Sequence, residues 1–239
     1  MSAPADSSTR AAARQGGPPL LAPALAFTVL TVAAILINHG VPGPRSDAAT
    51  VLAYYRNHAP ALRIGGLLQF GAAIPLAIWA TTVTQRLRTL GVNAPGPMLG
   101  LAGGLLAAAF LGLSGLLEWT ASGSADGDAS LARTLADLTF ATGGPGHVVP
   151  LALLVAGVAV PVLLVRLVWP PLAWAGLVIA AVGMVSTLTL AWLSLAVTLP
   201  VARFGAIAWI LAISVVLPVR RPRAAVPPGP ETVSTRRPG

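Results

Sequence analysis

The chain has 239 residues, of which 55% are hydrophobic and only 9% charged, whereas an ordinary soluble domain has about 25% charged residues. So few charged side chains cannot cover a water-exposed surface, and the absence of cysteine excludes disulfides, thiolate catalysis and cysteine-bound metals. The apolar runs are apolar on all sides rather than alternating, which excludes a β-barrel. We therefore predict an all-α fold, a polytopic membrane helical bundle.

Six transmembrane helices are predicted, because a helix needs ~20 apolar residues to cross a bilayer core of ~30 Å. The first run follows Arg10 and Arg14, as in a signal peptide, but it is longer than a signal sequence core and lacks a cleavage site. Proline stands near most of the other starts, where a helix tolerates it. The predicted spans are about 20–38, 61–86, 97–119, 145–166, 171–193 and 200–219.

The segments outside these spans divide into tails and outer helices. Residues 1–19 and the basic residues 220–239 are polar and are expected to be disordered. Two loops have apolar residues at helical spacing, so we expect outer interfacial helices at about 47–58 and 128–139. The residues that show this spacing are Val51, Leu52, Tyr55, Leu131, Leu135 and Leu138.

The distribution of arginine predicts the orientation. With both termini in the cytoplasm, the inner segments hold ten arginines and two acidic residues, a net charge of +8, and the outer segments hold five of each. The net charge of +8 therefore reflects membrane orientation and indicates no nucleic-acid partner. The expected location is the bacterial plasma membrane, with the lipid bilayer as partner and the C-terminal tail against anionic lipid.

Small residues predict which helix lies at the centre. Gly100, Gly104, Ala108 and Gly112 recur at every fourth position of the third span, and such residues mark helix contacts in membranes. Glu118 returns to the same side of that helix and is expected to point inward. On the second span, Gln69 shares a face with small residues and is expected to form an interhelical hydrogen bond.

The candidate site is a small polar vestibule at the outer side, because ionisable groups at membrane depth are costly and often functional. Its residues are Glu118, His147, His39, Asp137 and Gln69. A metal site, a proton-responsive site and an acid–base pair are all open, as is the alternative that each histidine only lies comfortably at the interface. No pair has the spacing of an HExxH motif. No catalytic residue, metal or cofactor is assigned.

The glycine-rich stretch from Phe140 to Pro150 (FATGGPGHVVP) raises the question of a ligand loop. It does not match a phosphate-binding loop, which needs GxxxxGK[ST] after a strand. We interpret it as a break between the second outer helix and the fourth span. Unwound backbone and His147 would then lie where Glu118 can approach.

Three segments resemble poorly characterised six-helix membrane proteins of actinobacteria, of the domain-of-unknown-function type. They are Phe70–Arg86 (FGAAIPLAIWATTVTQR), Leu113–Trp119 (LSGLLEW) and Phe140–Pro150. The resemblance covers about residues 20–218 and implies a six-span bundle without implying an activity.

The expected function is that of a non-enzymatic membrane protein, a scaffold or partner subunit that acts alone, as a homo-oligomer or with a protein partner. One alternative is a transporter for a small solute or a proton, with the kinked second and fourth spans as moving parts. Another is a membrane-embedded metal-dependent hydrolase. The hydrolase requires at least three of His39, His58, His147, Glu118 and Asp137 to converge on one point.

Overall fold

The computed structural model describes residues 19–123 and 127–219, and every regular element in these ranges is helical. Five helices are long and apolar enough to cross a membrane, which is the architecture of a multi-pass membrane protein. They cover Ala48–Thr89, Gly96–Ser122, Ala129–Leu164, Pro170–Leu190 and Leu193–Val216. The tails expected at 1–19 and 220–239 lie outside the described residues, except for Pro19.

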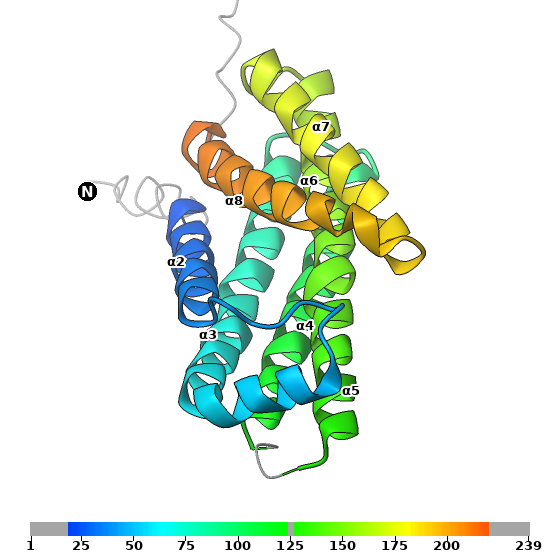
Figure 1. The fold of residues 1–239 in the computed structure, drawn as a ribbon. Helices are drawn as coiled ribbons and strands as arrows, with labels where there is room; N and C mark the ends of the chain where they lie inside the picture. Colours follow the sequence, from blue (N-terminus) through cyan, green and yellow to red (C-terminus); the bar gives the residue numbers. More distant parts are fainter. Residues whose placement is uncertain (1–18, 124–126, 220–239) are drawn as a thin grey trace, which may run out of the picture.

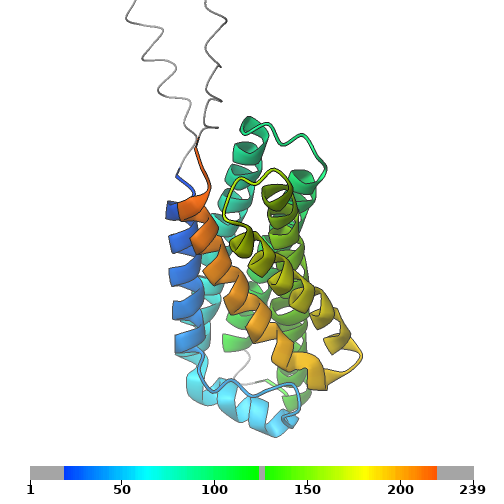
Figure 2. The ribbon, with the colours of Figure 1, turned by 90° about the horizontal axis from the view of Figure 1, so that it is seen from above.

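Helix α2 (Leu21–Ile37), the first helix in the described chain, is also apolar but shorter than these five, with 17 residues. It packs along α3 (Ala48–Thr89) and touches α8 (Thr198–Val216). The first residues of α2 and the last of α8 therefore lie side by side at one end of the bundle (Figures 1 and 2). The opposite end is covered by residues 38–47, and we call it the loop end.

Helix α3 contains both the first expected interfacial helix and the second expected span. Its backbone is non-helical at His58 (φ −125°, ψ 20°), two residues before Pro60, which has no backbone N–H to continue the helix. Asp47 caps the start by accepting hydrogen bonds from the Thr50 backbone and hydroxyl, which lowers the pKa of its carboxyl group. The first part of α3 thus runs across the loop end before the chain turns into the bundle (Figure 1).

The second expected interfacial helix leads directly into the fourth expected span. Helix α5 (Ala129–Ala141) is joined through a π-helical turn, η1 (Thr142–Gly146), to α6 (His147–Leu164). Pro145 lacks the backbone N–H that an α-helix would use, and Gly144 takes non-helical angles (φ −82°, ψ −107°), so the chain is kinked between the two helices. The glycines therefore interrupt the regular α-helix where the sequence predicted an interruption.

The fifth expected span is also irregular at its end. Helix α7 (Pro170–Val185) gives way to a 3₁₀ turn, η2 (Ser186–Leu190), and a second 3₁₀ turn, η3 (Leu193–Val197), leads into α8. Ser186 bonds both the Val182 carbonyl at 3.1 Å and the Thr198 hydroxyl at 2.9 Å. Hydroxyl side chains compete with backbone hydrogen bonds in this way, and they tie the η2 turn to the start of α8.

Helix α4 (Gly96–Ser122) lies between α3 and α6 with backbone against backbone. A Cβ atom at Gly157 of α6 would lie 2.3 Å from the backbone nitrogen of Gly100, and one at Gly66 of α3 would lie 2.6 Å from the carbonyl oxygen of Gly115. Only glycine permits such contacts, and between helices in lipid close packing of this kind is a main source of association. The α4 glycines therefore position both neighbours.

The substitution Gly157→Ala is expected to destabilise the protein by about 1–3 kcal/mol, because the new methyl group would meet backbone atoms that cannot move away. The matched control is Gly71→Ala, whose Cβ would meet only a side-chain atom of Leu30 at 3.9 Å. Denaturation of both variants in detergent micelles, followed by circular dichroism, measures the difference. Equal stability of the two variants would contradict the α4–α6 contact.

Candidate functional site

A cavity of about 410 Å³ lies towards the loop end, between α2, α3, α4, α5, η1 and the start of α8. Residues 41–44 form part of its wall. Apolar side chains such as Ile35, Leu62 and Leu199 form much of the rest. The polar side chains that line it are Asn38, Tyr55, Gln69, Ser114, Glu118, Thr139 and Arg203.

Glu118 points into the bundle, as its position on α4 predicted, and is only 6% exposed. Its Oε1 accepts a hydrogen bond from the Nδ2 of Asn38, which stands just after α2. The amide of Asn38 occupies the space left free by Gly65, where a Cβ would lie 2.0 Å from Nδ2. Three segments therefore combine to hold one buried carboxyl group.

Gln69 forms the expected interhelical hydrogen bond. Its Nε2 donates to the Oγ of Ser114 at 2.7 Å, and that hydroxyl donates to the backbone oxygen of Thr139 at 3.2 Å. Ser114 precedes Glu118 by one helical turn on α4, so both side chains face the same cavity. The pair links α3 and α4 to α5.

Arg203 on α8 completes the polar lining from the opposite side. Its Nη2 donates to the backbone oxygen of Gly143 in the π-helical turn. Neither Arg203 nor Asn38 is among the site residues predicted from the sequence. An arginine in an apolar run was the available signal, since such a side chain needs a partner within the bundle.

Several buried polar atoms in the cavity lining have no hydrogen-bond partner among the described residues. They are Asn38 Oδ1, Thr139 Oγ1 and Arg203 Nε, three of the six such atoms in the described chain. A buried polar group without a partner costs about 1–3 kcal/mol. These three atoms belong to side chains that line one cavity.

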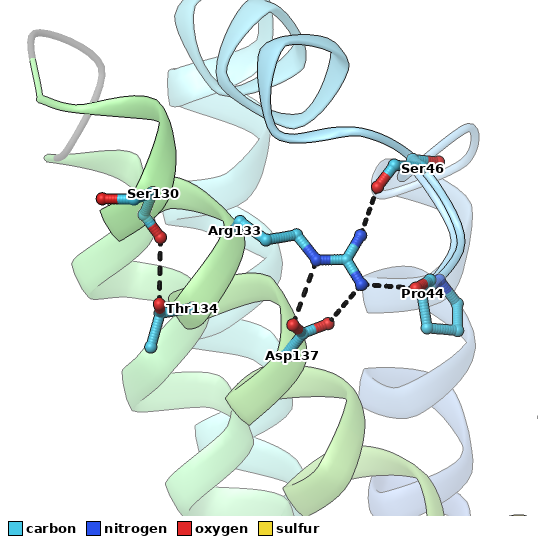
Figure 3. A network of polar contacts seen from close by, with 6 residues as sticks. All are labelled: Pro44, Ser46, Ser130, Arg133, Thr134 and Asp137. Carbon is cyan, nitrogen blue, oxygen red and sulfur yellow. Dashed lines mark hydrogen bonds and ion pairs between the residues drawn. The ribbon is translucent and has the colours of Figure 1, made fainter.

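Asp137 does not line this cavity but binds Arg133 one turn earlier on α5, with an Nη2–Oδ1 distance of 2.8 Å. The same guanidinium donates to the backbone oxygens of Pro44 and Ser46 (Figure 3). Asp137 therefore orients Arg133, and Arg133 holds the 38–47 segment in place beside the cavity.

The histidines do not join Glu118. His147 is fully buried, and its Nδ1 donates to the backbone oxygen of Ala107 at 2.9 Å. Ala107 precedes Glu118 by eleven residues on α4, which corresponds to about 16 Å along the helix axis. His39 and His58 are exposed and bond the carbonyl oxygens of Leu36 and Tyr54.

The condition set for a metal-dependent hydrolase is not met in the described part of the chain. Within residues 19–123 and 127–219, no three histidine, aspartate or glutamate side chains lie close enough together to hold a metal ion. The polar lining instead combines one carboxyl group with one guanidinium and neutral amides and hydroxyls. Such side chains can pair with charged groups and with hydrogen-bonding groups.

Comparison with known proteins does not assign this site. No protein-family model matches the chain, and no match was found among curated proteins or solved structures.

Replacing Arg133 by glutamine should loosen the 38–47 segment, because hydrogen bonds to a charged donor contribute about 1.5–3 kcal/mol. We expect exchange of the Ser46 amide hydrogen, which bonds the Gly43 oxygen at 3.0 Å, to become about tenfold faster. Hydrogen–deuterium exchange with mass spectrometry measures this. The control Arg45→Gln removes an exposed charge from the same segment and should leave the rate unchanged. Equal rates in both variants would show that Arg133 does not hold the segment.

Proposed function

We propose that this chain is a six-span protein of the bacterial plasma membrane that acts as a scaffold or partner subunit and binds a small polar ligand from the outer side. Binding alone, without catalysis, accounts for the cavity. The observation that carries the proposal is the cavity of about 410 Å³, whose lining includes the polar side chains of Asn38, Glu118 and Arg203.

The proposed orientation places the loop end outside and both termini in the cytoplasm. Its support is that the described chain begins and ends at one end of the bundle (Figure 2), as an even number of spans requires. Arg86 and Arg88 lie in the last turn of α3 and Arg166 follows α6, and arginine favours the cytoplasmic side. We further propose that the basic tail after Val219 touches anionic lipid.

The resemblance to the actinobacterial six-helix proteins remains part of the proposal. Two of its three segments contribute to the cavity: Leu113–Trp119 supplies Ser114 and Glu118, and Phe140–Pro150 supplies Phe140, Gly143 and Gly144. If those proteins have the same cavity, the resemblance reflects a common binding site as well as similar helix packing.

A transporter is the second candidate, and the π-helical turn favours it. Gly144 lines the cavity and is non-helical at the kink between α5 and α6. Interruptions of this kind bind substrates in membrane transporters, where broken helices expose backbone groups. Transport would also require a path past the buried hydrogen bond from Trp79 to Ser214.

Single-cysteine labelling tests the proposed function, and the natural absence of cysteine provides a clean background. In right-side-out membrane vesicles, a membrane-impermeant methanethiosulfonate reagent should label Ala136→Cys in the cavity wall and Gly123→Cys in an exposed loop. The exposed Ala94→Cys should be labelled only after permeabilisation, and the fully buried Ala159→Cys should remain unlabelled.

Two results would contradict the proposal. Labelling of Ala94→Cys in intact vesicles would place the opposite end of the bundle outside. Labelling of Gly123→Cys without Ala136→Cys would mean that no polar solute enters the cavity from that side.

A further inference from the structure

We propose that the cavity binds a small zwitterion, with its ammonium group against Glu118 and Asn38 and its anionic group against Arg203. The inference rests on the proposed function and specifies the chemical class of the ligand.

The α2–α4 side of the cavity offers hydrogen-bond acceptors. Glu118 uses Oε1 to accept from Asn38, which leaves its other oxygen for a ligand. The Oδ1 of Asn38 is buried and has no partner in the described chain. A carboxylate and an amide oxygen side by side are suited to an ammonium group, which brings three N–H donors and a positive charge.

The α8 side offers donors instead. Arg203 gives one Nη to the backbone oxygen of Gly143, and its Nε is buried without a partner in the described residues. A guanidinium presents five N–H donors in a planar fork, so it can hold Gly143 and still bind a carboxylate or phosphate. The bond to Gly143 fixes the position of the fork at the cavity wall.

Glu118 and Arg203 do not pair with each other. Among the described residues they form no ion pair, although both line the same cavity. A zwitterion offers each of the two side chains a partner of opposite charge, whereas a ligand with a single charge offers one to only one of them.

The carboxyl group and the guanidinium are connected through two intervening residues. Ser114 lies one turn, ~5–6 Å, from Glu118 on α4, and its Oγ is 2.4 Å from the place of a Cβ at Gly143. Arg203 donates to the oxygen of that glycine. Because both charged side chains also line one cavity, a single small molecule can contact both. Phosphoethanolamine carries an ammonium and a phosphate group on a two-carbon chain, either as a free solute or as a phospholipid headgroup, and it serves as the probe.

The test uses the full chain purified in detergent micelles and isothermal titration calorimetry with three probes. O-phosphoethanolamine carries both charges, ethanolamine only the positive one and inorganic phosphate only the negative. We expect phosphoethanolamine to bind at least about tenfold more tightly than either half. Asp128→Asn and Arg88→Gln, which change exposed residues that do not line the cavity, should bind as the unaltered chain does.

The variants should give a crossed pattern. Glu118→Gln should weaken phosphoethanolamine and ethanolamine at least about tenfold and leave phosphate unchanged, while Arg203→Gln should weaken phosphoethanolamine and phosphate and leave ethanolamine unchanged. If Arg203→Gln does not fold because the Gly143 contact is lost, the test rests on Glu118→Gln, which should lose affinity for phosphoethanolamine and ethanolamine but not for phosphate. Phosphate that binds as tightly as phosphoethanolamine to both the unaltered chain and Glu118→Gln would overturn the proposal.

A second arm separates the two sources of the ligand. The protein is re-purified from mixed micelles with equal amounts of phosphatidylethanolamine, phosphatidylcholine and phosphatidylglycerol, and retained lipids are counted by native mass spectrometry. Selective retention of phosphatidylethanolamine, lost in Glu118→Gln, supports a headgroup; calorimetric binding without retention supports a free solute. Absence of both overturns the zwitterion inference, and if Ala136→Cys is nevertheless labelled from outside, the proposed function stands without it.

Discussion

The backbones of α3 and α4 meet at Gly66 and Gly115, and those of α4 and α6 meet at Gly100 and Gly157. In lipid there is no hydrophobic driving force between helices, so contacts of this closeness determine how the bundle is assembled. They place α4 between its two neighbours and fix its rotation. Because α4 cannot rotate, Ser114 and Glu118 face the interior. This orientation also spares Glu118 the high cost of exposure to lipid.

The cavity follows from this arrangement together with the end of α2. Helix α2 stops at Ile37, and the chain crosses the loop end through residues 38–47 before α3 begins. Asn38 reaches Glu118 from the end of α2, Arg203 reaches Gly143 from α8, and neither contact fills the space between them. Arg133 keeps the crossing segment beside that space. The result is a cavity with a carboxyl group and a guanidinium group in its lining.

Much of the fold could be predicted from the sequence because its signals are local. Long apolar runs predict the helices, and the spacing from Gly100 to Gly112 predicts both the central helix and the inward direction of Glu118. Small residues on the same face of the second span predict an interhelical hydrogen bond from Gln69, and the bond to Ser114 confirms it.

The site depends on contacts between distant residues, which a single sequence does not reveal. Arg203 is 60 residues from Gly143, and Asn38 is 80 residues from Glu118. Glycine and proline predicted an interruption of the chain here, but not that the Gly143 oxygen accepts a hydrogen bond from Arg203. His147 and Glu118 were both expected near the outer ends of their spans. The imidazole of His147 instead bonds the backbone oxygen of Ala107, eleven residues before Glu118 on α4.

Formation of a disulfide between α3 and α4 is the most direct test of this account. A Cβ at Gly112 would lie 3.5 Å from the Cβ of Ala73, within the range that a disulfide requires. The account predicts that the double variant Ala73→Cys with Gly112→Cys crosslinks rapidly under mild oxidation, while Gly71→Cys with Gly112→Cys does not, because Gly71 faces Leu30 of α2. Crosslinking of the second pair, or of neither, would contradict the α3–α4 contact on which the position of Glu118 depends.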